Sequence, residues 1–594
     1  MGPREGARVL PSKHEVPRGN PETRCPGSRV GSSYWVAGRE GATRMMTASG
    51  GSTAARPPRG AIRLTAVLAS AFALAAGAPT KASGVAAVPA GTSGVASPAA
   101  GSTQSWPVAG QNIANTRDQA AETAISPSNV SRLAPAWTVT TAGDVTATPT
   151  MVANVLYFPD MGGMLWAVTS TGQVVWSHPV ASYTGIAGDV SRDSPAIDGG
   201  ELILGDGWDA NKLNAGAHVF AVNRATGQLL WSVKVDNNPA SIVTGSPTVY
   251  NGVAYVGISS YQEGLASKPG CCTFRGAVVA LNASTGQVLW KVYTVPSNNH
   301  GRDSNRPGYY SGGAVWGSAP AVDPATGLLY VATGNNYTVP AGVCDKPHQT
   351  NCTRPVPSDH LDSILALKLS TGAIAWGYRT EEADVSTGAC TTICGPDYDF
   401  GSSPNLITTT NPATGTTEQL VGVGQKSGYY WALSPSTGKL MWRTRIGPGG
   451  AGGGILWGSA TDGTRIYSAE ADTGGIPYKL KGSGPFAGQI ITSGSWTALD
   501  PATGAILWQT PDPQSLPDSG FVSVANGVAY VGSNAATGTN MYGLDASTGT
   551  ILWSFASGGE VRSGAAIVGA KVYWGSGYRG GENNKLYAFK LPAG

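Results

Sequence analysis

The chain has 594 residues, of which 83 are glycine and only 13% are charged. Glycine is about twice as frequent as in an average protein and charge about half as frequent, and Val, Thr, Trp and Tyr are common, so we expect many short strands and tight turns. The glycines have no period of three, which excludes collagen, and the net charge of +3 is too small to suggest a nucleic-acid or membrane-surface partner.

An export signal is predicted near the N-terminus. A basic region precedes an apolar run at 64–76, and the small residues at 76–78 are suited to signal-peptide cleavage. The run is shorter than the roughly 20 apolar residues of a membrane-spanning helix. We therefore expect a secreted, periplasmic or cell-envelope protein without an integral membrane segment in its mature form. A cytoplasmic tail ahead of a membrane anchor is the alternative.

Four segments follow from this interpretation. A signal peptide begins close to its own methionine, and Met45 or Met46 would serve. Residues 1–44 are then an over-long gene start or a disordered leader, and 45–78 are the signal peptide. Residues 79–104 are rich in Ala, Gly, Ser and Thr, which is typical of a flexible linker. The folded domain is expected over 105–594.

One pattern recurs through this domain, namely a strand, a Thr-Gly step, three residues and a tryptophan. An eighth copy is split between the termini, because Trp137 lies in the first segment and the last strand, at 586–591, has only the first half of the pattern. The seven complete copies end at Trp176, Trp231, Trp290, Trp376, Trp442, Trp508 and Trp553.

The repeat predicts an all-β, eight-bladed β-propeller. Apolar residues alternate on both sides of the turn, as in half-buried strands, and the Thr-Gly step supplies the positive φ of a tight hairpin. A further hairpin precedes each copy, so each repeat has four strands, and the Trp would fill the space between blades. Uneven Trp spacing argues against an open solenoid. It predicts insertions in the blades ending at Trp376, Trp442 and Trp508, on the functional face.

The cysteines agree with export. Cys25 lies ahead of the signal, and an even set of local pairs in an exported chain indicates disulfides. No CxxCH haem site or zinc spacing is present in the sequence. The three pairs are Cys271 with Cys272, Cys344 with Cys352, and Cys390 with Cys394.

The adjacent pair Cys271 and Cys272 is unusual. Neighbouring α-carbons lie about 3.8 Å apart across a trans peptide, whereas ordinary disulfides need about 4.4–6.8 Å. A bridge between neighbours would strain the peptide, and strain of this kind persists at functional sites. Two cysteines bridged to other partners are the alternative.

Three loops on successive blades carry oxygen ligands suited to calcium. Glu263 follows the strand AYVGISS, Asn335 follows LLYVATG, and Asp399 lies in DYDFGSSP. Taken singly, Glu263 could be a solvated loop acid and Asn335 an ordinary turn residue. On neighbouring blades, however, the three would converge near the axis of the ring.

Further polar residues occupy positions that should face the central funnel. Thr244 and Arg192 each lie three residues before a proline that opens a blade strand, and Arg562 has the same offset from Ala565. Lys426 lies at a strand end near the tight turn of GQKSGYY. A surface lysine is the alternative for Lys426.

The combination of motifs resembles the pyrroloquinoline quinone (PQQ)-dependent alcohol dehydrogenases, and most of all their polyvinyl alcohol dehydrogenase branch. The repeat alone is not specific, because non-enzymatic propellers share it. The resemblance runs from Trp106 to the C-terminus. It is carried by GQNIANTR (110–117), ISPSNVSRLAPAW (125–137), GCCTFRG (270–276), GGAVWGSAPAVDP (312–324), DYDFGSSPN (397–405), GQKSGYYWAL (424–433) and GGGILWGSATDG (452–463).

The resemblance implies PQQ and calcium at the centre of the propeller. Glu263, Asn335 and Asp399 match the family's calcium ligands, although the ISSYQE stretch is one residue longer than the common form. Asp399 also matches the carboxylate that takes the alcohol's proton as its hydride moves to the quinone, with Asp397 as the competing candidate. Lys426 matches a cation that donates to the quinone oxygens.

The resemblance also implies how the cofactor is enclosed. Trp316 matches the tryptophan that stacks on the quinone, and Trp457 is a second candidate for the cavity wall. Thr244 matches a threonine that binds a cofactor carboxylate, while Arg192 and Arg562 rest on position alone. Many relatives have a ring of adjacent cysteines over the cofactor, as Cys271 and Cys272 would form.

The chain departs from the family pattern in several places. The family's first-blade glutamate is replaced near Thr146, and the CxxCH cytochrome domain of some relatives is absent, so electrons would pass to a separate acceptor such as cytochrome c or a quinone. Gly401 stands where lanthanide-using relatives have an aspartate, which favours calcium. A non-catalytic propeller that binds proteins or polymers is the alternative function. Serine-hydrolase and phosphate-loop motifs are absent from the sequence.

Overall fold

The computed structural model describes residues 104–207, 215–264, 272–297, 309–317, 319–387, 395–410, 415–578 and 583–593. The predicted leader, signal peptide and nearly all of the linker therefore lie outside the described residues, as do Cys25, Cys271, Cys390 and Cys394. Within the described part of the chain, no helix has the length and apolar character needed to cross a membrane.

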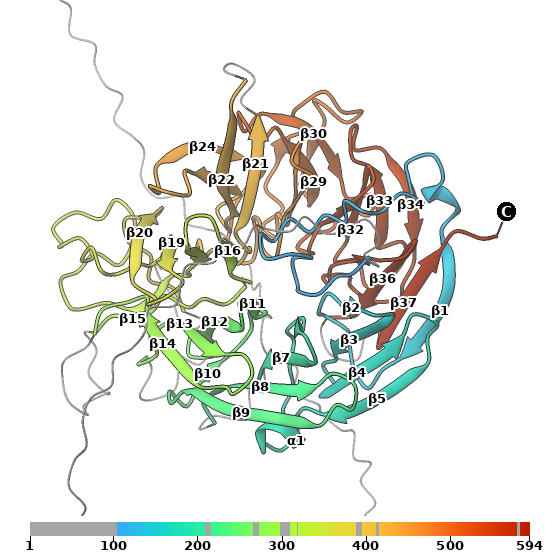
Figure 1. The fold of residues 1–594 in the computed structure, drawn as a ribbon. Helices are drawn as coiled ribbons and strands as arrows, with labels where there is room; N and C mark the ends of the chain where they lie inside the picture. Colours follow the sequence, from blue (N-terminus) through green and yellow to red (C-terminus); the bar gives the residue numbers. More distant parts are fainter. Residues whose placement is uncertain are drawn as a thin grey trace, which may run out of the picture.

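Eight antiparallel sheets form a ring of blades, as the repeat predicts (Figure 1). The strands of blades 1 to 4 are β2(Thr150–Val152), β3(Val155–Pro159), β4(Met164–Thr169) and β5(Val174–Pro179); β6(Ala196–Asp198), β7(Glu201–Gly205), β8(Ala217–Asn223) and β9(Leu229–Asp236); β11(Thr248–Tyr250), β12(Val253–Ser260), β13(Ala277–Asn282) and β14(Val288–Tyr293), with β10(Ser241–Ile242) beside β12; and β16(Ala321–Asp323), β17(Leu328–Ala332), β19(Ser363–Lys368) and β20(Ile374–Arg379).

The second half of the ring repeats this architecture. The strands of blades 5 to 8 are β21(Asn405–Thr410), β22(Thr417–Gly424), β23(Tyr429–Leu433) and β24(Leu440–Arg445); β25(Ala460–Thr461), β26(Ile466–Glu470), β29(Ser495–Leu499) and β30(Ile506–Pro511); β31(Ser523–Ala525), β32(Val528–Gly532), β33(Met541–Asp545) and β34(Ile551–Phe555); and β35(Ala566–Ile567), β36(Lys571–Ser576), β37(Lys585–Lys590) and β1(Ala134–Thr140).

The split eighth repeat closes the ring. Strand β1, from the start of the propeller, pairs antiparallel with β37 from its end, and Trp137 lies opposite Ala588. Blade 8 therefore takes its outermost strand from the N-terminal side and its other three from the C-terminal side, as predicted.

Each repeat tryptophan joins two neighbouring blades. Its indole Nε1 donates to a backbone carbonyl of the following blade at 2.8–3.1 Å. At the last junction the acceptor is the carbonyl of Leu133, which follows the turn η1(Val130–Arg132), at 3.0 Å. The ring of Trp231, from blade 2, lies against Gly286 of blade 3, which has φ 71°, and a Cβ added there would lie 2.5 Å from the ring. The Thr-Gly glycine thus serves both the turn and the seating of the indole.

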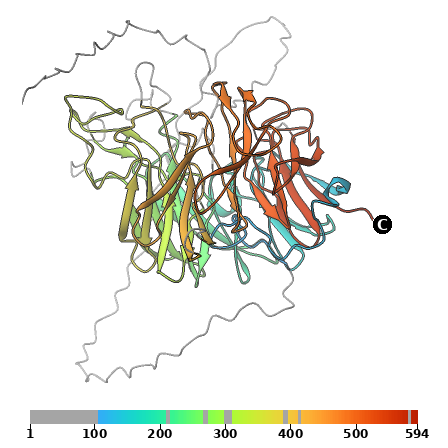
Figure 2. The same ribbon diagram turned by 90° about the horizontal axis from the view of Figure 1, so that it is seen from above.

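The inserted segments lie in the connections between strands, which gather on one side of the ring when it is viewed edge-on (Figure 2). Blade 4 contains the pair β15(Ser311–Gly312) and β18(Asn336–Thr338) and the predicted Cys344–Cys352 disulfide, and blade 6 contains β27(Tyr478–Lys479) and β28(Ile490–Ile491). The insertion predicted within the blade ending at Trp442 is misplaced, because the long segment at 380–404 precedes the first strand of that blade. A short helix, α1(Ala181–Thr184), connects blades 1 and 2.

The N-terminal segment at 106–119 runs across the middle of the ring, where it is drawn in blue (Figure 1). Its backbone is hydrogen-bonded to the innermost strands of six blades, namely β2, β6, β16, β21, β25 and β31. Bonding to six strands in turn requires irregular backbone, and Gln111, Asn115 and Arg117 all have positive φ. We call this segment the plug, because it closes the centre of the ring.

Candidate active site

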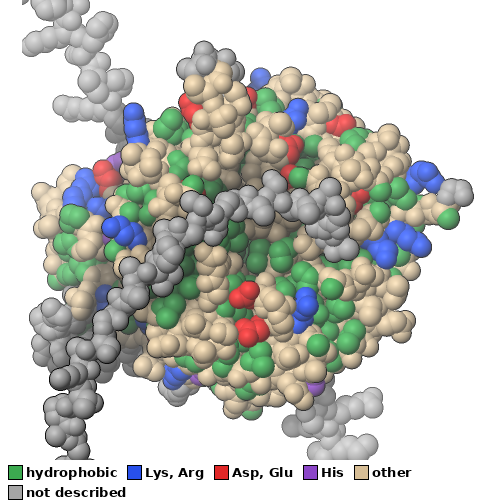
Figure 3. Space-filling model, in the orientation of Figure 1, with side chains coloured by type: hydrophobic (Ala, Val, Ile, Leu, Met, Phe, Trp, Pro, Cys, Tyr) green, Lys and Arg blue, Asp and Glu red, His purple; other side chains and the backbone are tan. Residues whose placement is uncertain are grey.

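A cavity lies on the plug, at the level of the residues that precede the innermost strands. Arg192, Thr244 and Trp457 line it, as their positions in the repeat predict, and the face of the molecule is hollowed toward its centre (Figure 3). The complete lining is Ala109, Thr146, Ala147, Arg192, Ser194, Thr244, Ser246, Gly317, Ala319, Ser403, Trp457 and Phe521.

Lys426 joins two aspartates beside this cavity. Its Nζ lies 2.8 Å from Asp397 Oδ1 and 2.8 Å from Asp399 Oδ2, and both Lys426 and Asp399 are buried. One carboxylate oxygen from each of Glu263, Asp397 and Asp399 lies within 4.8 Å of the other two. When all four groups are ionised, three carboxylates and one ammonium leave an excess of two negative charges, which a divalent cation would balance.

The protonation equilibria reflect this crowding of charge. Burial, followed by the neighbouring charge of Asp399, raises the pKa of Glu263 to about 7. Burial also raises the pKa of Asp397 well above its usual value, although Lys426 opposes the effect. For Lys426, burial acts to lower the pKa, but Asp397, Asp399 and Glu263 raise it well above its usual value.

Asn335, which immediately precedes β18, is held in one amide orientation. Its backbone N–H donates to Asp399 Oδ1 at 2.5 Å, and its side-chain Nδ2 donates to Asn336 O at 3.1 Å and to Ser386 O at 2.8 Å. With Nδ2 engaged by two carbonyls, Oδ1 is the side-chain atom left to bind a cation.

Trp316 connects the acidic group to the cavity. Its Nε1 donates to Asp399 Oδ2 at 3.1 Å, and Lys426 Nζ lies 5.3 Å from the centre of its ring. Its ring meets that of Trp457 at 86°, with centroids 5.5 Å apart. Thr244 Oγ1 donates to the backbone carbonyl of Trp316 at 2.6 Å, so Thr244 also positions this tryptophan.

The two arginines differ in their surroundings. The guanidinium of Arg192 lies 4.5 Å from the centre of the Trp457 ring and makes no hydrogen bond or ion pair with the described residues, so its donors can serve an anion. Arg562 instead bonds Glu560, with Nε 2.9 Å and Nη2 2.6 Å from Oε2, and stacks on Tyr578. Arg562 is absent from the cavity lining, and its charge is already compensated.

Comparison with known proteins identifies the family. Residues 106–448 match the family model described as glucose/ethanol/alcohol dehydrogenase, beta-propeller domain, which is the propeller of the PQQ enzymes. A polyvinyl alcohol dehydrogenase of Pseudomonas sp is 30% identical over 539 residues, which cover 82% of this chain and 77% of that protein. The chain belongs to the PQQ-dependent alcohol dehydrogenases. The predicted resemblance is confirmed.

Other relatives of this PQQ-dependent alcohol dehydrogenase agree. A polyvinyl alcohol dehydrogenase of Sphingopyxis sp. (strain 113P3) is 30% identical over 79% of this chain and 74% of that protein. The crystal structure of quinohemoprotein alcohol dehydrogenase from Comamonas testosteroni has a TM-score of 0.63 at 20% identity and covers 83% of this chain and 81% of that chain, which shows the same fold. Residues 492–591 separately match the family model of the outer membrane protein assembly factor BamB.

The side chains in and beside the cavity of the PQQ-dependent alcohol dehydrogenase have the chemistry that the cofactor and metal of its family require. Arg192 offers a guanidinium that makes no hydrogen bond or ion pair with the described residues, and Trp457 Nε1 is a buried donor without a partner among them. With the aromatic face of Trp316, these groups suit a planar molecule with several carboxylates. The excess negative charge around Glu263 suits a hard divalent cation.

Asp384 is a residue of this site that sequence reasoning missed. Its carboxylate is buried and accepts from the backbone N–H groups of Asp397 at 3.1 Å and Tyr398 at 2.8 Å. Asp397 has φ 57°, a left-handed conformation that needs support in a non-glycine residue. Asp384 thus fixes the loop that presents Asp397 and Asp399. No local motif marks it, because the contact depends on how 380–404 folds back.

The adjacent cysteines are described only in part. Cys272 is half-buried and disulfide-bonded, and Cys271 lies outside the described residues. Cys344 and Cys352 are bonded to each other, so the partner of Cys272 also lies outside the described residues. The ring predicted over the cofactor therefore stays a prediction.

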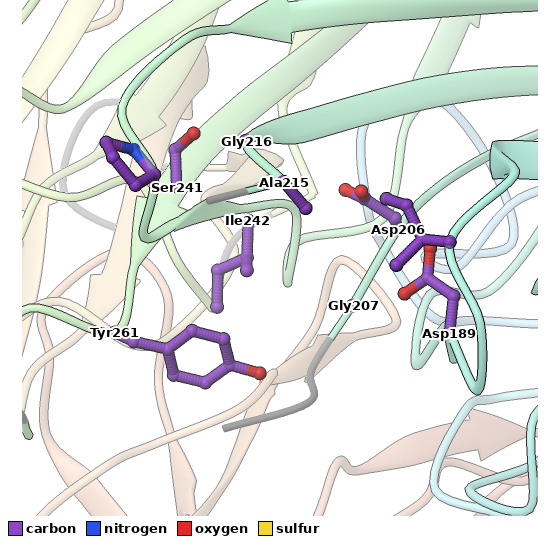
Figure 4. Close-up of a pocket in the computed structure, with 10 residues that line it drawn as sticks. Asp189, Asp206, Gly207, Ala215, Gly216, Ser241, Ile242 and Tyr261 are labelled. Carbon is purple, nitrogen blue, oxygen red and sulfur yellow. The ribbon is translucent and has the colours of Figure 1, made fainter. Parts of the chain in front are cut away.

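A second cavity lies between blades 2 and 3 (Figure 4). Asp189 and Asp206 face Ser241, Ile242 and Tyr261 across it, and Tyr261 precedes Glu263 by two residues. Both aspartates are hydrogen-bonded by the protein. Asp206 accepts from the backbone and the ring of His218 at 2.8 Å each, and Asp189 accepts from Thr184 Oγ1 at 2.6 Å. The cavity adjoins the loop that carries Glu263 but lacks the excess acid of the central group.

Proposed function

We propose that this chain oxidises a secondary alcohol, with PQQ and calcium bound in and beside the central cavity. The observation that carries the proposal is the bridge of Lys426 between Asp397 and Asp399, next to Glu263 and against the face of Trp316. A propeller used only for assembly gains nothing from gathering three carboxylates, of which Asp399 is buried and two are half-buried, around one buried ammonium, because that arrangement costs free energy of folding.

The chain's own residues divide between the two ligands. Glu263, Asp399 and the Oδ1 atom of Asn335 would bind calcium, and Asp397 is close enough to be a further ligand. The aromatic face of Trp316 would support the cofactor's ring system. Polar contacts to the cofactor would come from Arg192, Thr244, Lys426 and, at the cavity wall, Trp457, with Arg562 as an outer cation and the Cys271–Cys272 pair as a cover.

The reaction requires a base next to the alcohol. When bound, PQQ supplies the two-electron acceptor for the alcohol's hydride. Asp399 takes the proton from the hydroxyl oxygen, while Lys426 and Trp316, which both donate to Oδ2, hold its carboxylate in place. Lys426 would also counter the negative charge that develops on the alcohol oxygen as its proton leaves. Asp397 shares Lys426 and is the competing base.

The substrate class comes from the relatives. Two that match most of the chain are named polyvinyl alcohol dehydrogenases, so we propose the secondary hydroxyls of that polymer or of a similar alcohol. We further propose that the chain works outside the cytoplasm, in the periplasm, the cell envelope or the medium. Electrons would then pass to an external acceptor such as a cytochrome c or a quinone.

A scaffold function is the second candidate, favoured by the match of residues 492–591 to the BamB family model. That match covers part of blade 6 together with blades 7 and 8. It does not include Glu263, Asp399 or Lys426, so it reflects the propeller repeat and leaves the acidic group unexplained.

A dye-linked assay tests the proposal. The full chain, loaded with PQQ and calcium, should reduce the dye with polyvinyl alcohol and with a short secondary diol. Asp399→Asn should lower kcat by about 10²–10⁴-fold, the usual contribution of a positioned base, with little change in PQQ binding. Asp397→Asn is the matched variant, since it removes the other carboxylate that pairs with Lys426. If Asp397→Asn abolishes turnover and Asp399→Asn does not, the base is Asp397.

A further inference from the structure

A second group of buried carboxylates lies in blade 6 and in the connection to blade 7. Glu470 ends β26, Asp472 begins the insertion that follows, and Asp512 and Asp518 lie between β30 and β31. Their exposed fractions are 0%, 4%, 3% and 0%, respectively. None of these residues takes part in the candidate active site described above.

Every one of these carboxylates has an oxygen without a hydrogen-bond partner among the described residues. For Asp518 both oxygens are unpartnered, and the others are Glu470 Oε2, Asp472 Oδ2 and Asp512 Oδ2. Buried carboxylates without partners are strongly unfavourable unless protons or a cation neutralise them. The need for a neutralising proton or cation is greatest at Asp518, which is fully buried.

Gly494 lets these groups approach one another. A Cβ added there would lie 2.7 Å from Asp518 Oδ2 and 2.8 Å from Glu470 O. The carbonyl of Gly494 accepts from the backbone N–H of Asp512 at 3.1 Å. Three chain segments therefore meet at this glycine. Because it has no side chain, the Asp518 carboxylate can lie next to backbone carbonyl oxygens, and calcium prefers such oxygen ligands.

Asp518, Asp512 and Glu470 lie close enough for their charges to affect one another. Burial raises the pKa of Asp518 well above its usual value, and Asp512 and then Glu470 raise it further. One nearby cation, Arg445, acts on Glu470, but its Nε donates to the backbone carbonyl of Gly447 at 3.1 Å. No ion pair joins any of the four carboxylates to a described basic residue.

We propose that Asp518 and Asp512 bind a divalent cation of the calcium type, with Glu470 and backbone carbonyls next to it. The site would be separate from the proposed catalytic metal. It would tie the insertion between β26 and β29 to the connection between β30 and β31, and so stabilise the loops of this part of the ring. Its role is structural and does not depend on PQQ.

Calcium binding to the full chain tests the proposal. The chelator-treated protein, without PQQ, is titrated with calcium chloride, and bound calcium is counted after gel filtration. Asp518→Asn should bind one calcium fewer per chain than the unmodified protein and should lose at least half of the calcium-induced rise in Tm. Asp399→Asn serves as the matched variant for the proposed catalytic site, and Asp512→Asn repeats the test should Asp518→Asn fail to fold.

The outcomes separate the two sites. If the catalytic metal is absent but the new site is real, Asp399→Asn binds as much calcium as the unmodified protein and Asp518→Asn still binds one fewer. Equal calcium counts and equal Tm shifts for Asp518→Asn and the unmodified protein would overturn the proposal. The proposal would also be overturned if Asp518→Asn had a higher Tm than the unmodified protein without calcium and this difference grew with pH. That result would mean that protons, and not a cation, neutralise these carboxylates.

Discussion

At the scale of single residues, the candidate site is governed by the charge of Lys426. Its ammonium lies 2.8 Å from oxygens of both Asp397 and Asp399 and offsets one of three clustered carboxylates. The same ammonium would therefore compete with the proposed metal for these carboxylates and would position the proposed base. Removing the ammonium should therefore strengthen metal binding but weaken turnover.

Replacing Lys426 with methionine separates the roles. Lys426→Met keeps an unbranched side chain and removes one positive charge next to two proposed ligands. Calcium should bind at least tenfold more tightly, or by about 1.4 kcal/mol, while turnover falls. Calcium titration and the dye-linked assay measure the two effects. Lys439→Met, at an exposed lysine of the same blade, is the control. Weaker calcium binding in Lys426→Met would contradict the charge balance described here.

Asp384 makes a second prediction at this scale. Asp384→Asn replaces a carboxylate that accepts from two backbone N–H groups with an amide whose NH₂ would oppose one of them. The loss of one such buried bond costs about 1–3 kcal/mol. We expect a lower Tm, together with weaker calcium binding that added calcium restores. Glu382→Gln removes an exposed acid two residues away that pairs with exposed Arg354, so it should lower Tm only slightly and leave calcium binding unchanged. A lower Tm with unaltered calcium affinity would make Asp384 a purely structural residue.

Sequence reasoning singled out Glu263, Asn335 and Lys426 from strand ends of the repeat, and Asp399 from the stretch DYDFGSSPN that resembles the family. It did not find Asp384, since that residue acts on the backbone of a loop whose path depends on tertiary folding. Arg562 was placed by the same offset as Arg192, but the offset does not reveal that Glu560 already compensates its charge. The position of a residue in the repeat thus predicts whether its side chain points toward the axis of the ring. Whether that side chain forms an ion pair depends on the neighbouring loops.

At the scale of elements, the glycine of the Thr-Gly step has two roles: it forms the hairpin turn and it leaves room for the tryptophan of the neighbouring blade. Gly286 closes the hairpin between β13 and β14 with φ 71° and leaves room for the Trp231 ring. The Trp231 Nε1 donates to Ala283 O at 2.8 Å in the same turn. The sequence predicted the turn and the interblade tryptophan separately. Their contact follows from the stacking of neighbouring blades.

A pair of glycine variants measures this contact. Gly252 has φ 69° and nothing within 4 Å of an added Cβ, so Gly252→Ala costs only the backbone strain, about 1 kcal/mol. Gly286→Ala has the same backbone cost and also pushes a methyl group into the Trp231 ring. Its free energy of unfolding should fall by a further 1–3 kcal/mol or so. Urea unfolding compares the two variants, and equal losses would show that the indole moves aside freely.

At the scale of the whole molecule, two N-terminal features complete the propeller. Strand β1 closes the ring through β37, and the plug joins six innermost strands and supports the cavity through Ala109. The split repeat predicted the closure. The plug was visible in the sequence only as the stretch 110–117 shared with the family, because irregular backbone has no periodic pattern.

Arg117 is the residue through which the plug is best tested. Its guanidinium donates to Ala109 O, Val522 O and Thr148 Oγ1 at 2.7–2.9 Å. Arg117→Met leaves these buried acceptors unpaired, at a cost of about 3 kcal/mol in the free energy of unfolding. It should also weaken PQQ binding, because Ala109 belongs to the cavity lining. Arg132→Met, at an exposed arginine, is the control. Unchanged stability in Arg117→Met would mean that the plug is dispensable.

The most direct test of the account as a whole is the dependence of turnover on both ligands. The purified chain, stripped of metal, is assayed for dye reduction with a secondary alcohol after addition of PQQ, calcium, both or neither. Turnover that appears only with both, and disappears again on chelation, is the predicted result. Turnover that is indifferent to either addition, or a chain that binds no PQQ in the presence of calcium, would contradict the assignment of the central cavity.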